Sequence, residues 1–136
     1  MTAAASAGLA EFPIHATAAA ADLQRARTWY ERKLGLMPER EDAGGVWYRF
    51  GGDTWLYLCG TQSAGTAQNT IAGWTVTAME TVMANLRGRG AVFEDYDFGD
   101  FKTVNGLADF GTAKAAWFKD SEGNTYELSE VIARGP

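Results

Sequence analysis

Apolar residues recur every three or four positions along 23–34, with charged residues in the positions between them. This spacing places the apolar side chains on one face of a helix. Asp22 stands at the position of an N-cap residue, and Gly35 stands where a helix would end. The pattern therefore predicts an amphipathic helix that packs against a sheet. Its apolar face consists of Leu23, Ala26, Tyr30 and Leu34.

Short runs typical of strands occur on either side of this helix and again in the second half of the chain. The first-half runs at 46–50 and 54–59 flank Gly51-Gly52-Asp53, which predicts a hairpin. Residues 97–112 read as a long loop. All the predicted strands are 12–20, 46–50, 54–59, 71–76, 92–96, 114–119 and 124–132.

The predicted helix starts and ends recur at the same spacing in the two halves of the chain. Thr77 and Glu80 have the spacing of a capping box, which predicts a second helix that Gly90 ends. The predicted N-caps Asp22 and Thr77 are 55 residues apart, and the terminating glycines Gly35 and Gly90 have the same separation. A repeated offset of this kind indicates an internal duplication.

The predicted fold is α+β, with two βαβββ modules that form a curved mixed sheet around a concave cavity and carry their helices outside. Residues 12–132 are expected to be one domain, because a single module is too small to close a core. The first module spans about 12–60, the linker 61–70 and the second module about 71–132. Residues 1–11 are expected to be a flexible tail rather than a signal peptide.

Composition and charge narrow the classes of partner. The chain has 136 residues, with 12 basic against 17 acidic residues and a net charge of −5. This balance disfavours nucleic acid and anionic membranes, and it suits a neutral or cationic small molecule. No apolar run approaches the roughly 18 residues of a membrane-spanning helix. The single cysteine, Cys59, excludes an internal disulfide, so a cytoplasmic location is expected.

Several short motifs along the domain resemble one superfamily. They are Ile14-His15, Asp22-Leu23, Trp29-Tyr30, Leu34-Gly35-Leu36 and the stretch 117–128. The last is similar to the Phe-x-Asp-Pro-Asp-Gly-Asn-x-x-Glu-Leu ending of the vicinal oxygen chelate superfamily, with Ser121 in place of proline. That superfamily includes glyoxalase I, bleomycin resistance proteins and type I extradiol dioxygenases. Because its fold hosts many reactions, the resemblance implies the fold rather than one activity.

The resemblance also implies a divalent metal, bound by residues from the first and last strand of each module. The corresponding positions in this chain are His15, Tyr57, Ile71 and Glu127. Isoleucine is no ligand and tyrosine is a rare one, so we expect no metal and no other cofactor. If a divalent metal does bind, His15 and Glu127 are its expected ligands. The same two residues are either an acid/base pair of an enzyme or residues inherited with the fold.

Alternation along the strands indicates which side chains line the concave cavity. If His15 points inward, the hairpin contributes Trp55 and Tyr57 and also either Trp47 or Tyr48. Large aromatic side chains on one face favour a pocket for a flat molecule.

The loop from 94 to 112 mixes acidic and aromatic residues. It is either a solvated loop or a mobile lid from which Phe101 and Phe110 reach into the cavity. The candidate ligand-binding residues are therefore His15, Trp47, Trp55, Tyr57, Phe101, Phe110 and Glu127.

Two classes of function agree with these observations. A scaffold that lacks half of the metal site and keeps an aromatic cavity is similar to the drug-sequestering branch of the superfamily. That hypothesis implies a homodimer that binds a small aromatic or polycyclic natural product without chemistry, as in antibiotic resistance. The alternative is an isomerase, lyase or ring-cleaving enzyme of the same superfamily that uses His15 and Glu127, with or without a metal.

Overall fold

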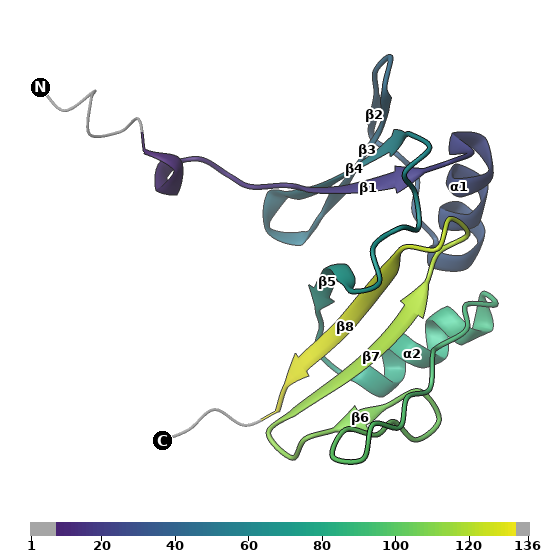
Figure 1. Ribbon diagram of the computed structural model, residues 1–136. Helices are drawn as coiled ribbons and strands as arrows, with labels where there is room; N and C mark the ends of the chain where they lie inside the picture. Colours follow the sequence, from purple (N-terminus) through teal and green to yellow (C-terminus); the bar gives the residue numbers. More distant parts are fainter. Residues whose placement is uncertain (1–7, 133–136) are drawn as a thin grey trace, which may run out of the picture.

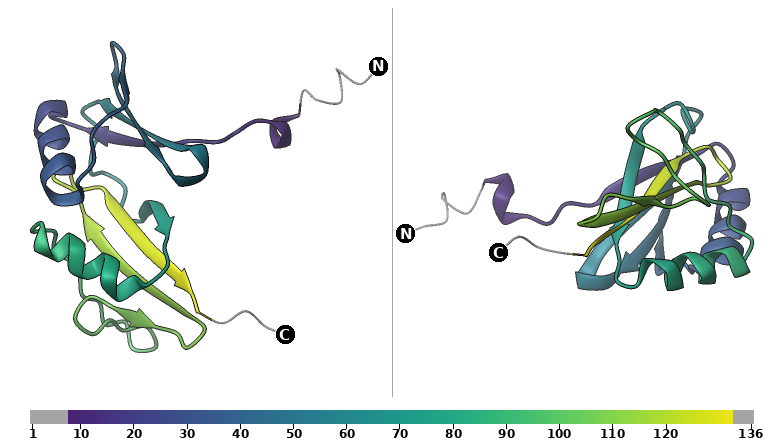
Figure 2. Two further views of the ribbon diagram at one scale, coloured as in Figure 1. Left: turned by 180° about the vertical axis from the view of Figure 1, so that it is seen from behind. Right: turned by 90° about the horizontal axis from the view of Figure 1, so that it is seen from below.

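Two four-stranded sheets, each with one main helix against it, make up residues 8–132, the part of the chain that the computed structural model describes (Figure 1). The two helices lie on the same side of the molecule, as the two views of Figure 2 also show. Within 8–132, no helix is long and apolar enough to cross a membrane. The predicted α+β fold of two βαβββ modules is confirmed.

The first module has the sheet order β1-β4-β3-β2. Strand β1 pairs in parallel with β4, and β4 pairs antiparallel with β3 across the predicted hairpin. The predicted first helix is present, and its last turn widens to a π-helical turn that Gly35 ends with a φ of 71°. The elements are β1 (Ala16–Ala20), α1 (Leu23–Trp29), the π turn (Tyr30–Leu34), β2 (Arg40–Glu41), β3 (Gly45–Phe50) and β4 (Thr54–Gly60).

The second module repeats this topology with the sheet order β5-β8-β7-β6, and β5 pairs in parallel with β8. The edge strands β1 and β5 contact each other where the two modules meet. The shared topology agrees with the duplication that the spacing of caps and glycines predicts. The elements are β5 (Thr70–Thr75), α2 (Met79–Gly88), β6 (Ala108–Asp109), β7 (Ala113–Lys119) and β8 (Thr125–Val131).

Two predicted strands differ from the structure. The strand expected over 12–20 begins only at Ala16, and a 3-10 turn at Leu9–Glu11 precedes it. The segment 92–96 makes only an isolated bridge, from Phe93 to Phe118, because β6 takes the outer place on β7. Strand β5 begins at Thr70, one residue before the expected strand 71–76. Residues 1–7 of the expected tail lie outside the described part of the chain.

The start of α2 also differs from its prediction. Its N-cap is Ala78, with a φ of 53°, rather than Thr77. The carboxylate of Glu130, on the neighbouring strand β8, accepts hydrogen bonds from the backbone nitrogens of Ala78 (2.8 Å) and Met79 (3.0 Å). Glu80 pairs instead with the ammonium group of Lys114, at 2.7 Å. A carboxylate distant in sequence therefore satisfies the free amides of this helix end.

The core fills the space between the helices and the sheets. Alternate residues of the central strands, such as Leu56 and Leu58 of β4, are buried there, as strand alternation predicts. Each large apolar side chain removed from water in this way contributes about 1.5–3 kcal/mol. The largest fully buried side chains are Tyr30, Tyr48, Tyr126, Phe118, Leu58, Met79 and Val46.

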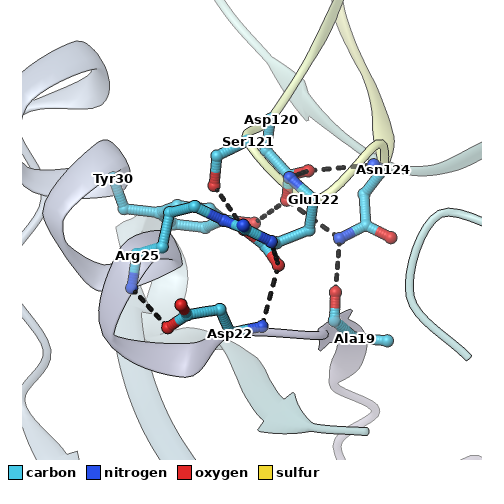
Figure 3. Close-up of polar contacts among 8 residues, drawn as sticks. All are labelled: Ala19, Asp22, Arg25, Tyr30, Asp120, Ser121, Glu122 and Asn124. Atoms are coloured by element: carbon cyan, nitrogen blue, oxygen red, sulfur yellow. Dashed lines mark hydrogen bonds and ion pairs between the residues drawn. The ribbon is translucent and has the colours of Figure 1, made fainter. Parts of the chain in front are cut away.

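A polar network joins the β7–β8 turn of the second module to the first module (Figure 3). The Glu122 carboxylate accepts a hydrogen bond from the backbone nitrogen of Asp22 at 3.0 Å, and it binds the guanidinium of Arg25. The Asn124 side chain donates to the carbonyl oxygen of Ala19 at 2.7 Å. The motif that resembles the superfamily ending therefore connects the two modules.

Candidate functional site

The face of the first sheet that points away from α1 carries a row of aromatic and basic side chains. Cross-strand pairing sets this row, because directly paired residues point to the same face. Trp47 pairs with Tyr57 across β3–β4 and with Arg40 across β2–β3, and Arg49 pairs with Trp55. We call Trp47, Trp55 and Tyr57 the aromatic face.

The sequence leaves open whether Trp47 or Tyr48 points to the open face of the sheet, and the burial of the two residues answers this question. Tyr48 is 1% exposed and stacks on Tyr30 of the first helix at a ring distance of 5.5 Å. Trp47 therefore lies on the open face. Three aromatic side chains of one hairpin, from its two strands, thus share one side of the sheet.

The rings of the aromatic face contact one another. The centroid of Trp47 lies 4.5 Å from that of Tyr57 and 6.3 Å from that of Trp55. His15, which immediately precedes β1, meets the Trp47 ring edge to face at 4.9 Å. The structure therefore brings four of the predicted ligand-binding residues together.

Asp42, in the β2–β3 turn, holds the polar edges of two of these rings. Its carboxylate accepts hydrogen bonds from the Tyr57 hydroxyl (2.8 Å) and from Trp47 Nε1 (3.2 Å). It also accepts from the backbone nitrogens of Gly44 (2.9 Å) and Gly45 (3.0 Å). These donors, the Tyr57 hydroxyl first, lower the pKa of Asp42, and the same hydrogen bond raises the pKa of Tyr57. Two rings are therefore fixed in orientation although both are part of an open surface.

A cleft of about 770 Å³ lies beside the aromatic face, at the junction of the two modules. His15 and Trp55 line it from the first module, and Ile71 and Trp74 line it from β5. Gly73, between those two residues, lets β5 run close to β8, because a Cβ there would stand 2.8 Å from the carbonyl oxygen of Glu127. The volume is in the range of small-molecule sites.

The residues present do not fit the divalent metal that the resemblance implies. Two of the four positions are Ile71, which has no donor atom, and Tyr57, whose hydroxyl donates to Asp42. Within residues 8–132, no group of three or more His, Cys, Asp or Glu side chains is placed to hold a metal ion. His15 lines the cleft, whereas Glu127 is not among its lining residues. We therefore assign no metal chemistry to this site.

Phe101 and Phe110 belong to a second aromatic cluster, on the other sheet. Phe101 packs on Trp117 of β7 at 5.2 Å and on Phe110 at 5.7 Å. Tyr96 packs on Trp117 at 5.8 Å and stacks on Phe98 at 5.7 Å. The structure therefore does not bring Phe101 and Phe110 into the cleft with His15 and Trp55. We call Tyr96, Phe98, Phe101, Phe110 and Trp117 the loop cluster.

The loop that carries this cluster is tied down at its base. The Asp95 carboxylate accepts hydrogen bonds from the Thr103 hydroxyl and from the backbone nitrogen of Gly106, both at 2.7 Å. Even so, the residues Phe98 and Phe110 remain 72% and 52% exposed. The loop is thus anchored at its base and leaves apolar rings at the surface.

Sequence reasoning missed several residues of the site. Trp74 is in the cleft lining, and Arg40 and Asp42 surround the aromatic face. Arg40 lies on a strand of only two residues, which is too short to show alternation. Trp117 could have been found, because it alternates with the buried Ala116 and Phe118 along β7.

No protein-family model matches the sequence, and no curated protein matches it. Solved structures do match the fold. A glyoxalase / bleomycin resistance protein from Catenulispora acidiphila superposes with a TM-score of 0.63 and 19% identity, over 88% of this chain and 98% of that one. TnmS3, an antibiotic binding protein from Streptomyces sp. CB03234, has a TM-score of 0.62 and 18% identity, over 88% and 95% of the two chains.

The fosfomycin resistance protein FosX from Listeria monocytogenes superposes with a TM-score of 0.61 and 12% identity, over 92% of this chain and 94% of that one. These superpositions establish a shared fold, and the low sequence identities leave the function open. Three observations agree: the two modules share one topology, the Asp-Ser-Glu-Gly-Asn turn joins them, and solved structures superpose on the chain. The chain has the vicinal oxygen chelate fold of the glyoxalase and bleomycin resistance proteins, as its motifs predict.

Proposed function

We propose that the protein binds a small aromatic or polycyclic compound at the aromatic face and the adjoining cleft, and that it holds this compound without changing it. The observation that carries the proposal is the set of rings at Trp47, Trp55 and Tyr57 next to a cleft of about 770 Å³, with Trp47 and Tyr57 held in place by Asp42. Flat rings offer stacking area at a low entropy cost, because their orientation is already set. That one protein of this fold is an antibiotic binding protein supports the same class of function.

A fluorescence titration tests this proposal. Anthraquinone-2-carboxamide serves as a flat probe, quenching of tryptophan emission reports binding, and mass spectrometry of the recovered probe reports any change. We expect saturable quenching, with Trp55→Leu weakening binding at least tenfold through the loss of one stacking surface. Trp29→Phe is the matched control, because Trp29 stacks on Phe118 on the helix side of the sheets.

The outcomes separate the candidate functions. A probe recovered unchanged from a complex that Trp55→Leu weakens supports sequestration. A probe that is altered by the native protein but not by His15→Ala would favour the enzyme hypothesis instead. Equal quenching of native protein and Trp55→Leu would contradict the proposed site.

We also propose that the working form is a homodimer in which a second copy covers the aromatic face. This proposal rests on the loop cluster, whose exposed rings lie on the other sheet and outside the cleft. The loop cluster of one copy would cover the aromatic face of its partner, so each shared site would combine both sets of rings. Mixing two defective variants, Trp55→Leu and Trp117→Leu, tests it. If the site is shared, the mixed dimer should regain one intact site. Both substitutions then lie in one of its two sites, and the second site combines the native Trp55 of one copy with the native Trp117 of the other. Failure of the mixture to bind, or a monomeric mass by light scattering, would contradict it.

A further inference from the structure

Arg40 places a positive charge over the aromatic face. Its guanidinium carbon lies 5.1 Å from the ring centroid of Trp55 and 5.3 Å from that of Trp47. The register explains the position, because Arg40 pairs with Trp47 across β2–β3 and so points to the same face. Trp55 is also in the lining of the cleft, so the charge adjoins the space in which a ligand would lie.

The guanidinium of Arg40 is not paired with a carboxylate. Within residues 8–132, Arg40 forms no ion pair, whereas Arg49, also over Trp55, binds Asp53 at 2.9 Å and lies 3.9 Å from Glu39. The nearby carboxylate of Asp42 accepts four hydrogen bonds from its own turn and from the two rings. Arg40 therefore keeps its guanidinium hydrogens available next to the stacking surface.

We propose that the ligand is a planar aromatic acid, whose ring stacks on Trp55 or Trp47 and whose carboxylate or other anionic group pairs with Arg40. This inference rests on the proposed function and specifies the class of ligand. A guanidinium suits the task, because it stacks on rings and donates two parallel hydrogen bonds to a carboxylate. The net charge of −5 favours neutral or cationic ligands, but it acts through screened, distant charges, whereas Arg40 is in contact with the rings.

Three probes that share one ring system and carry a negative, a neutral or a positive substituent test the inference: anthraquinone-2-carboxylate, the corresponding carboxamide and the corresponding aminomethyl compound. Their dissociation constants are measured by tryptophan quenching for the native protein, for Arg40→Gln and for Arg32→Gln. Arg32→Gln is the matched control, because Arg32 is an exposed arginine on the π turn that follows α1. Arg40→Lys shows whether the charge alone is enough.

We expect the carboxylate to bind the native protein about tenfold more tightly than the carboxamide, since a hydrogen bond to a charged group has about that effect. Arg40→Gln should abolish this preference and leave carboxamide binding within about twofold, whereas Arg32→Gln should keep it. The preference should also shrink as salt is raised.

The inference is overturned if the native protein binds the carboxylate and the carboxamide equally, or if the aminomethyl probe binds best. It is also overturned if Arg40→Gln weakens all three probes alike, because Arg40 then only packs on the rings. In each of these cases the proposed function survives. If none of the three probes binds any of the proteins, the proposed function fails together with the inference.

Discussion

The guanidinium of Arg25 and the carboxylate of Glu122, 97 residues apart in sequence, form two hydrogen bonds that join the first helix to the last hairpin (Figure 3). Nε donates to Oε2 at 2.8 Å, and Nη2 donates to Oε1 at 2.9 Å. The Glu122 side chain has no exposed surface, while that of Arg25 is 55% exposed. The pair therefore joins the two modules through a contact that is buried on the Glu122 side.

Glu122→Gln should destabilise the protein by about 2 kcal/mol at pH 7, the usual cost of losing hydrogen bonds to a charged group. The measurement is the urea midpoint at constant slope. The matched control is Glu41→Gln, whose partner Arg27 lies 3.3 Å away in an exposed pair, and it should cost less than about 0.5 kcal/mol. Similar losses of unfolding free energy in both variants would show that burial does not strengthen the pair of Arg25 and Glu122.

The same carboxylate predicts a dependence of stability on pH. Hydrogen bonding to Arg25, above all, lowers the pKa of Glu122 to about 2, from an ordinary value of 4.5. A carboxyl group with a lowered native pKa stabilises fully above its unfolded pKa and loses that contribution as the pH falls through its native pKa. The difference in unfolding free energy between native protein and Glu122→Gln should therefore shrink between about pH 4.5 and pH 2. A difference that stays constant over this interval would contradict the assignment.

The hydroxyls of Tyr30 and Tyr126 lie 2.6 Å apart, and the Tyr30 hydroxyl also lies 2.6 Å from the buried Asp120 carboxylate. Because Asp120 accepts, Tyr30 donates to it and receives from Tyr126. Tyr30→Phe removes the central group and leaves a carboxylate and a hydroxyl short of partners, so it should cost about 2–3 kcal/mol. Tyr126→Phe removes only one donor and should cost about 1 kcal/mol.

Tyr48→Phe is the control for this pair. The Tyr48 hydroxyl is buried and has no hydrogen-bond partner among the described residues, so its removal should change stability by less than about 0.5 kcal/mol. Thermal or urea unfolding of the three variants gives the order of effects. An equal loss in Tyr126→Phe and Tyr30→Phe would mean that the proposed direction of the hydrogen bonds is wrong.

Asp42→Asn should weaken binding of the anthraquinone carboxamide about three- to tenfold, because the amide nitrogen cannot accept from Trp47 and Tyr57 then donates only to a neutral oxygen. Asp42 is a positioning residue, so a second readout is needed. The hydrogen bond to Asp42 raises the pKa of Tyr57, and the variant should move that pKa back toward its ordinary value.

Phenolate absorbance, compared with Tyr57→Phe to assign the signal, measures this shift. Asp53→Asn is the control, since Asp53 binds Arg49 and contacts neither ring through a hydrogen bond. Unchanged binding together with a lowered Tyr57 pKa would mean that Asp42 orients the rings without any consequence for the ligand.

Local sequence pattern determined the two modules. The apolar stripe of 23–34 and the alternation of Trp55 and Tyr57 with Leu56 and Leu58 are set by the period of a helix or a strand. These periods act over a few residues, so the helices, the hairpin and the alternation along each strand follow from neighbouring positions. The pairing of the two modules follows from their size, because one module alone is too small to close a core.

Contacts between distant residues decided what the sequence left open or placed wrongly. Glu130, rather than Thr77, caps α2 because β8 runs beside the helix end. Phe101 packs on Trp117 and Phe110 packs on Phe101, whereas Arg40 lies over Trp47 and Trp55.

Each of these outcomes depends on which strands pair and in what register. A one-residue change of register would exchange the two faces of a strand without altering its local pattern. Strand pairing is a long-range property of the folded chain, and for this reason the composition of the site could be predicted from sequence only in part.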